Sequence, residues 1–306
     1  MGFECIRLSA AWKEIAEQGF GELDRLLSAA DAAQQPIVLT VGMKAIGWPE
    51  FYLPASHVPS PGPRLNIRRN QALRLATLVF VRTVVRRYRD SSVLRAWQVE
   101  NEPFNRSGPS GWWIDRFVVR EEARLVRRLD GRPLMLTTFA RFTDSMDRAS
   151  SRFASDRRWF RISAEREALA VLGRNDILGL DVYRAIAGGM GENAWLAHAA
   201  PDQFASLARW RRIARGQGKR TWITEAQAEP WEPGGGSRPD PLTLRPGDLP
   251  TLARSLMELG FEAVLFWGAE YWLARAAAGD QRWLEAVGGL LESARRREAP
   301  FSVSAG

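Results

Sequence analysis

The sequence predicts an α/β fold of the (β/α)8-barrel type, in which parallel strands are joined by crossover helices. Short apolar or β-branched runs alternate with helical patterns seven times along the chain, which is typical of parallel strands and their crossover helices. The 306 residues suffice for one such barrel, which takes roughly 250 residues. Hydrophobic residues make up 45% of the chain, a globular value that excludes wholesale disorder.

Seven runs are expected to be strands because they are short, rich in apolar, β-branched or aromatic residues and bounded by turn residues. In chain order they cover residues 3–9, 36–44, 93–102, 134–139, 177–183, 221–225 and 261–267. Helical spacing predicts helices over 21–34, 66–88, 113–129, 165–172, 203–217, 250–259 and 281–297. Glycine and proline stand at the stops between elements, as in Gly131-Arg132-Pro133 before the fourth run.

No break in composition divides the chain, so we interpret residues 1–306 as one barrel domain. The loop-rich stretch 229–247 is long for a strand-to-helix connection. Loops of this kind form sites more often than linkers, so we expect this one to border a site.

Histidine and cysteine are too scarce for several kinds of site. Cys5 is the single cysteine, and His57 and His198 are the only histidines. These counts exclude an internal disulfide and a Cys/His zinc site, and they disfavour a Ser-His-Asp triad. Acid/base chemistry in this chain must therefore depend on carboxylates, and we expect no metal and no cofactor.

The net charge of +8 and the pI near 10.4 suggest nucleic-acid binding, but the pattern of basic residues argues against it. Only three residues are lysines, and the arginines lie in amphipathic segments, as solvated helix faces do. The N-terminus has no signal-peptide pattern, and no apolar run approaches the length of a membrane span. We expect a protein that does not cross a membrane, and the compartment stays open.

Two predicted strands end in carboxylates. The third run ends in Gln98-Val99-Glu100-Asn101-Glu102-Pro103, a polar cluster that is costly in a buried strand unless the strand opens to solvent there. The sixth run ends at Glu225. A charged loop start or an ion pair explains either carboxylate alone, but barrel enzymes place catalytic residues at strand carboxyl ends. The pair therefore predicts an active site at the barrel mouth.

Three motifs together resemble the clan A retaining glycoside hydrolases, TIM barrels that include the family five cellulases and mannanases. They are Asn101-Glu102-Pro103 after a hydrophobic strand, Glu225 at the end of a later strand, and the aromatic last strand Leu265-Phe266-Trp267-Gly268. In that clan the matching strands are the fourth, seventh and eighth. Arg7 with its neighbours resembles the clan's second strand and Asp181-Val182-Tyr183 its sixth, so the resemblance covers most of the chain.

The resemblance implies a retaining glycosidase that cleaves β-linked glucan, mannan or related oligosaccharides by a two-glutamate double displacement. Glu102 matches the general acid/base and Glu225 the nucleophile. Retention requires one protonated and one ionised carboxyl about 5 to 5.5 Å apart. In the clan, the residue matching Asn101 binds the sugar 2-hydroxyl, those matching Arg7 and Tyr183 hold the nucleophile ionised, and the one matching Trp267 forms the platform under the sugar.

Tryptophans are abundant near the predicted strand ends, where indole rings stack on sugars. Those at or just beyond a strand end are Trp12, Trp48, Trp112, Trp113, Trp231, Trp267 and Trp272. Most tryptophans are packing residues, so we expect sugar contact first from Trp267, then from Trp231 and Trp48. Trp159, Trp195, Trp210 and Trp283 lie in or near helical patterns and are expected to be structural. Lys44 either points into the mouth or is a solvated loop residue.

The strand count departs from the clan. The first predicted strand carries the Arg7 motif of the clan's second strand, so the sequence predicts an incomplete barrel of seven strands. Residues 301–304 could supply a strand only by breaking the usual order. Unpaired edges favour association, so we expect a chain whose true start lies upstream, or edges covered by a partner, by self-association or by a bent helix.

Two other functions remain as alternatives. The first is a catalytically inactive barrel that only binds carbohydrate, as the missing strand suggests. The second is nucleic-acid binding through the basic charge. The joint presence of Glu102, Glu225, Asn101, Tyr183 and Arg7 favours the enzyme.

Overall fold

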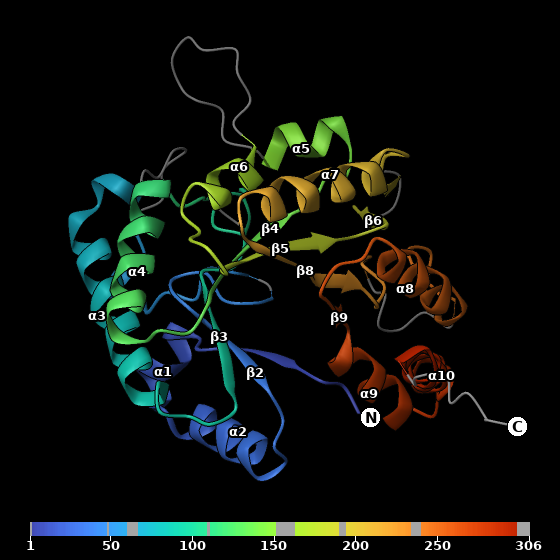
Figure 1. Ribbon diagram of the computed structural model, residues 1–306, viewed down its shortest axis with the longest axis horizontal. Coiled ribbons are helices and arrows are strands. Elements are labelled where there is room, and N and C mark those ends of the chain that lie inside the picture. Colours follow the sequence, from blue (N-terminus) through green and yellow to red (C-terminus); the bar gives the residue numbers. More distant parts are fainter. Residues whose placement is uncertain are drawn as a thin grey trace, which may run out of the picture.

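A computed structural model describes residues 2–47, 49–59, 67–108, 111–150, 163–189, 194–233 and 240–298. Seven parallel strands form its central sheet, which curls into a nearly closed barrel (Figure 1). In spatial order they are β1 (Ile6–Ser9), β2 (Ile37–Val41), β3 (Leu94–Val99), β4 (Leu134–Phe139), β5 (Ile177–Val182), β8 (Arg220–Gln227) and β9 (Ala263–Trp267). All seven predicted strands are present in the predicted order, and the predicted fold class, a seven-stranded α/β barrel, is confirmed.

Helices surround the sheet on its outer side (Figure 1). They are α1 (Trp12–Gln18), α2 (Gly21–Ala32), α3 (Gln71–Tyr88), α4 (Arg116–Leu129), α5 (Asp144–Ser150), α6 (Ala164–Leu169), α7 (Gln203–Gly216), α8 (Leu249–Glu258), α9 (Ala269–Ala277) and α10 (Arg282–Glu298), with 3-10 turns at Ala55–His57, Ile67–Arg69 and Pro246–Asp248. The sequence missed α1, α5 and α9. It also began two helices too early, because Asn70 and Asp115 accept backbone hydrogen bonds from Leu73 and Phe117 and thereby cap α3 and α4.

Strand alternation divides the core into an outer and an inner part. Ile37, Leu39 and Val41 face outward and pack with residues of the helices. The intervening Val38 belongs to a separate cluster inside the barrel, which we call the apolar floor: Val38, Ala96, Met135, Ile177 and Trp222. Further along the same strands the buried inward side chains are polar, namely Thr40, Gln98, Thr137, Asp181 and Thr224. The polar groups are therefore gathered at the carboxyl ends of the strands.

The two edge strands are less buried than the strands between them. Every residue of β9 is partly exposed, whereas β2 and β5 are buried throughout. No hydrogen-bonded ladder joins β1 to β9 among the described strands. Phe3, just ahead of β1, instead stacks on Trp272 of α9 with ring centroids 6.1 Å apart, in a cluster that also holds Trp283 of α10. Helices after β9 thus contact the chain before β1; self-association through these edges stays a prediction, and residues 301–304 lie outside the described part.

A small hairpin over the barrel was not foreseen. β6 (Ala185–Gly188) pairs antiparallel with β7 (Trp195–His198). The assignment of Trp195 to a helical neighbourhood was wrong, because this residue pairs with Gly188 in the hairpin. The strands are only four residues long and rich in alanine and glycine, so they lack the β-branched signal on which strand prediction depends.

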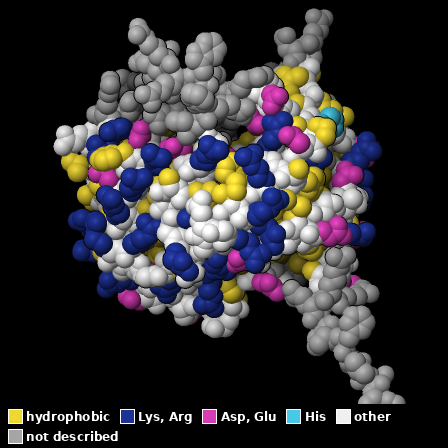
Figure 2. Space-filling model, turned by 45° about the horizontal axis from the view of Figure 1, so that its top comes forward, with side chains coloured by type: hydrophobic (Ala, Val, Ile, Leu, Met, Phe, Trp, Pro, Cys, Tyr) yellow, Lys and Arg dark blue, Asp and Glu magenta, His cyan; other side chains and the backbone are white. Residues whose placement is uncertain are grey.

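Basic side chains are spread over the face shown in Figure 2, with acidic, apolar and uncharged groups between them. Several arginines are paired with carboxylates; Arg141, for example, contacts both Asp147 and Asp202. Within the described ranges, no helix has the length and hydropathy needed to cross a membrane.

The polar part of the barrel interior is packed too tightly for one additional methyl group. A Cβ on Gly179 of β5 would lie 2.5 Å from Thr224 Oγ1 and 2.9 Å from Thr137 Cγ2. We expect Gly179→Ala to lower the free energy of unfolding by about 1–3 kcal/mol because a packed interior must distort to accept the methyl group. Chemical denaturation measures this change. Gly216→Ala is the control: it has no atom within 4 Å of its Cβ and lies in α7, where alanine is favoured. Equal stability of the two variants would contradict the tight packing.

Candidate active site

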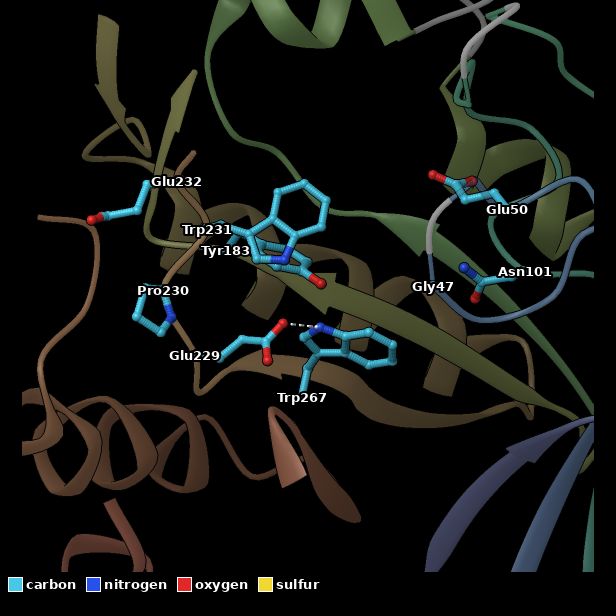
Figure 3. Close-up of a pocket in the computed structure, with 9 residues that line it drawn as sticks. All are labelled: Gly47, Glu50, Asn101, Tyr183, Glu229, Pro230, Trp231, Glu232 and Trp267. Atoms are coloured by element: carbon cyan, nitrogen blue, oxygen red, sulfur yellow. Dashed lines mark hydrogen bonds between the residues drawn. The ribbon is translucent and has the colours of Figure 1, made fainter. Parts of the chain in front are cut away.

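A cavity of about 340 Å³ opens at the carboxyl ends of the strands (Figure 3). Aromatic and acidic side chains surround it from several sides of the barrel. Its lining residues are Gly47, Glu50, Asn101, Tyr183, Glu229, Pro230, Trp231, Glu232 and Trp267. Four of the site residues singled out from the sequence, Asn101, Tyr183, Trp231 and Trp267, therefore share one cavity, whereas Glu102 and Glu225 are not among its lining residues.

Glu225 lies on β8 and is held at both carboxylate oxygens. Its Oε1 forms an ion pair with Arg7 Nη2, and its Oε2 accepts a hydrogen bond of 2.8 Å from the Tyr183 hydroxyl. Arg7 also donates from Nη1 to Gln98 Oε1 at 3.2 Å. These donors fix the orientation of the Glu225 carboxyl and stabilise its ionised form.

Burial would lower the pKa of Arg7, but the neighbouring carboxylates of Glu225 and Asp181 raise it by more. The side chains of Arg7 and Glu225 are only 5% and 7% exposed. Water therefore screens their attraction weakly, and removal of either partner would leave a buried charge without compensation.

Glu102 lies on the loop that directly follows β3. The strand ends at Val99 because Glu100 and Glu102 have positive φ angles of 60° and 42°, an uncommon conformation for residues other than glycine. The Glu102 amide donates to Thr137 Oγ1 at 2.9 Å, and its carbonyl accepts from Lys44 Nζ at 2.8 Å. The neighbouring strands thus fix the loop that carries Glu102.

Glu100 holds the backbone of the neighbouring loop after β2. Its carboxylate accepts the backbone N–H groups of Met43 at 2.8 Å and Lys44 at 2.6 Å, after β2. A Cβ on Gly42, which has a φ of 135°, would lie 2.2 Å from the Glu100 carboxyl carbon, so only glycine fits there. Burial raises the pKa of Glu100 to about 7. The sequence had left open whether Glu100 supports the site, and the structure gives it the role of tying the β2 and β3 loops together.

The surroundings of Glu102 favour its protonated form. Burial raises its pKa well above the usual value, and the nearby carboxylates of Asp181, Glu50 and Glu225 raise it further. Lys44 opposes them only in part. One end of the barrel therefore holds one carboxyl whose surroundings favour the protonated form and another, Glu225, that accepts donors at both of its oxygens.

Asn101, which directly precedes Glu102, lines the cavity. Its Oδ1 accepts from Gln98 Nε2 at 3.0 Å and from Thr137 Oγ1 at 3.3 Å. The amide oxygen is thus engaged by the barrel interior, which leaves the Asn101 amide nitrogen as the group that a ligand in the cavity can meet (Figure 3).

Aromatic rings form two sides of the cavity, as Figure 3 shows. Trp267 donates from Nε1 to Glu229 Oε1 at 2.8 Å, and Trp231 packs on Tyr183 with ring centroids 4.9 Å apart. Trp48 lies outside the described residues. Trp12, Trp112 and Trp272, for which no sugar contact was predicted, are buried at 7%, 8% and 1% exposure and pack against Phe80, Phe51 and Phe3.

Three residues of this region, Lys44, Glu229 and Asp181, were missed or left undecided by sequence reasoning. Lys44 is fully buried and contacts Glu50 Oε2 at 3.0 Å, so the solvated-loop alternative is wrong. Glu229 borders the cavity, and burial raises its pKa to about 7. Asp181 lies beneath Glu102 and Glu225 in the interior. Glu229 could have been found from its place four residues after Glu225, in the loop expected to border a site.

In the part of the chain that the structure describes, no three His, Cys, Asp or Glu side chains are grouped to hold a metal ion.

No protein-family model matches the sequence, and no curated protein matches it. Several solved structures are nevertheless similar to this one. GH5_18 from Streptomyces cattleya in complex with GlcNAc is 12% identical with a TM-score of 0.55, over 87% of this chain and 62% of that one. A GH5_18 variant from Bifidobacterium longum in complex with Manβ1-4GlcNAc is 13% identical with a TM-score of 0.56, over 87% and 60%. The β-galactosidase of the haloarchaeon Halorubrum lacusprofundi is 15% identical with a TM-score of 0.53, over 87% and 48%.

These likenesses show the fold, which is the TIM-barrel fold found in glycoside hydrolases, as expected from the sequence motifs. This chain spans about half to three fifths of the length of the three proteins.

The buried carboxyls predict an unusual dependence of stability on pH. The folded state raises the pKa of Glu100 and Glu229 to about 7 and of Asp181 to about 8, mainly through burial. A raised folded-state pKa contributes stability that is present below the unfolded value, near 4, and is lost as pH rises through 7 to 8. Asp24 and Asp280 have lowered pKa values, caused first by hydrogen bonds from Arg87 and Arg282, and their contribution is lost only below about pH 4.

We therefore expect the free energy of unfolding, measured by chemical denaturation, to fall by about 3 kcal/mol or more between pH 5 and pH 8. The double variant Glu100→Gln/Glu229→Gln should show a shallower fall. A stability that stays level or rises over this range would contradict the protonated carboxyls.

Proposed function

We propose that the chain is a retaining β-glycosidase that acts on β-linked glucan, mannan or related oligosaccharides. The observation that carries this proposal is the unequal surroundings of the two carboxyls of Glu102 and Glu225. Glu225 receives donors from Arg7 and Tyr183 at both oxygens, whereas burial and like charges keep the proton on Glu102. Retaining hydrolysis requires this division between a nucleophile and an acid.

In the first step, a Glu225 oxygen attacks the anomeric carbon while the bond from that carbon to the leaving oxygen breaks. Glu102 gives its proton to the leaving oxygen, so no alkoxide is released. Formation of the glycosyl ester consumes the negative charge of Glu225: one of its oxygens bonds to the anomeric carbon, and the other becomes the ester carbonyl, which can still accept a hydrogen bond. The Asn101 amide nitrogen is placed to donate to the sugar 2-hydroxyl.

In the second step, the Glu102 carboxylate removes a proton from water, and the water oxygen attacks the anomeric carbon. The ester bond to Glu225 breaks, and its carboxylate returns to Arg7 and Tyr183. Two inversions at one carbon restore the β-configuration.

The cavity lining supports a sugar as the ligand. Trp267 and Trp231 offer broad apolar faces, and Glu229, Glu50 and Asn101 offer hydrogen-bonding groups around them. Such a mixture of aromatic faces and polar edges suits a pyranose ring, which has both apolar faces and equatorial hydroxyls. Trp48 remains a proposed further contact.

Incubation with aryl β-glucosides, aryl β-mannosides and β-glucan tests the proposal. We expect turnover by the wild type and a loss of kcat of at least about 10³-fold in Glu225→Gln, because the amide cannot act as the nucleophile. Glutamine keeps a hydrogen-bond acceptor for Arg7, so it disturbs the fold less than alanine does. Glu102→Gln should lose most activity on β-glucan but far less on substrates with acidic leaving phenols, which need no proton.

Glu270→Gln serves as the control, because Glu270 is an exposed carboxyl near the same end of the barrel. Its kinetics should match those of the wild type. Binding of oligosaccharide by a folded wild type without any turnover would overturn the enzyme proposal and favour an inactive carbohydrate-binding barrel.

A further inference from the structure

A third carboxyl lies inside the barrel below Glu102 and Glu225. Asp181 is the fifth residue of β5 and is fully buried. Its Oδ1 accepts a hydrogen bond of 2.6 Å from Thr224 Oγ1, while its Oδ2 is buried without a hydrogen-bond partner among the described residues. In the register of β5 and β8 its Cα is the direct partner of that of Glu225. A buried carboxyl in this position needs an explanation that the two-glutamate chemistry does not supply.

The charges around Asp181 do not balance if every carboxyl is ionised. Among the described residues, two cations contact carboxyls at this end of the barrel: Arg7 from β1 pairs with Glu225, and Lys44 after β2 pairs with Glu50. Glu102 after β3 and Asp181 are left without a cation of their own among the described residues. The Tyr183 hydroxyl donates to Glu225, and Glu229 adds a further carboxyl beyond it. Two neighbouring buried carboxyls without a counter-ion cannot both ionise near neutral pH.

We propose that Asp181 is a positioning residue for the acid/base step: it is buried on the strand beside β4, whose Thr137 holds the Glu102 amide, and among the described residues neither carboxyl has a cation of its own, so Glu102 retains the proton that it delivers. The catalytic role of Asp181 rests on the proposed glycosidase function. The retention of a proton by Asp181 and Glu102 does not, because it depends only on the folded chain.

The electrostatics of the pair agree with this arrangement. Burial raises the pKa of Asp181 to about 8, the charge of Glu225 raises it too, and Arg7 opposes them. After burial, the charge of Asp181 is the largest influence that raises the pKa of Glu102. A negative charge on Asp181 favours the protonated form of Glu102. The titration belongs to the pair, and the pair holds a proton to a higher pH than an isolated glutamate does.

Asp181→Asn tests the proposal, because asparagine keeps the size and the acceptor for Thr224 but removes the charge. Carboxyl ¹³C NMR of protein labelled at glutamate Cδ follows the Glu102 proton directly, and Glu102→Gln assigns its signal. We expect the Glu102 pKa to fall by at least one pH unit in Asp181→Asn. The alkaline limb of kcat/KM on an aryl β-glycoside should move down by the same amount, with KM nearly unchanged. An unchanged Glu102 titration in a folded variant would overturn the proposal.

Asp176→Asn is the matched control. Asp176 immediately precedes the same strand at the opposite end of the barrel, is also buried, and pairs with Arg127. Its replacement should lower stability but leave the Glu102 titration in place. A purely structural role of Asp181 predicts that both variants behave alike, with lower stability and an unmoved pH profile.

The NMR titration separates this proposal from the proposed function, because it needs no turnover. If the wild type hydrolyses none of the glycosides but Glu102 titrates in coupled steps with Asp181, the glycosidase proposal fails and the proton retention stands. If Asp181→Asn does not fold, the wild-type titration of aspartate and glutamate carboxyls decides: independent titration of both groups near their ordinary values would overturn the proposal.

Discussion

The ion pair between Arg7 and Glu225 is the interaction on which the rest of the structure depends. It joins residues 218 positions apart in the sequence, one on the edge strand β1 and the other on β8, next to the opposite edge β9. No ladder of backbone hydrogen bonds joins those edges among the described strands, so this buried contact and the stacking of Phe3 on Trp272 link them through side chains. The positive charge of Arg7 therefore both orients the Glu225 carboxylate and helps to hold the barrel together.

The division of the barrel interior explains how carboxyls can be so concentrated at one end. The apolar floor fills the amino-terminal half with ordinary packing, and the polar half above it is held by Thr137, Gln98 and the Lys44–Glu50 pair. Thr137 and Lys44 hold the backbone of Glu102, Gln98 holds the side-chain amide of Asn101, and Glu50 lines the cavity. Burial without enough cations then determines where the protons lie, because an isolated charge is costly in such an interior. The protonation state of each buried carboxyl consequently depends on all the charged groups in the polar half of the barrel interior.

The fold could be predicted, and Glu102 and Glu225 could be singled out as candidates, because both depend on local patterns. Each strand is a short apolar run with turn residues beside it, and both glutamates directly follow such a run. What could not be predicted depends on contacts between distant segments. The burial of Lys44 results from Glu50 and the Glu102 carbonyl closing over it, and the role of Asp181 results from its strand register with Glu225. Trp12 and Trp272 have the same local context as Trp267, and only the packing of helices over them distinguishes core from cavity.

Trapping of the covalent intermediate tests the division of labour between the two glutamates most directly. A 2-deoxy-2-fluoro β-glucosyl or β-mannosyl fluoride should react once with the enzyme and slow its own release, so that intact mass spectrometry shows one added glycosyl group. Peptide mapping should place that group on Glu225, and Glu225→Gln should stay unlabelled. A label on Glu102 or on any other residue, or hydrolysis of a β-glycoside to the α-anomer with no covalent species, would contradict the assignment of Glu225 as the nucleophile held by Arg7.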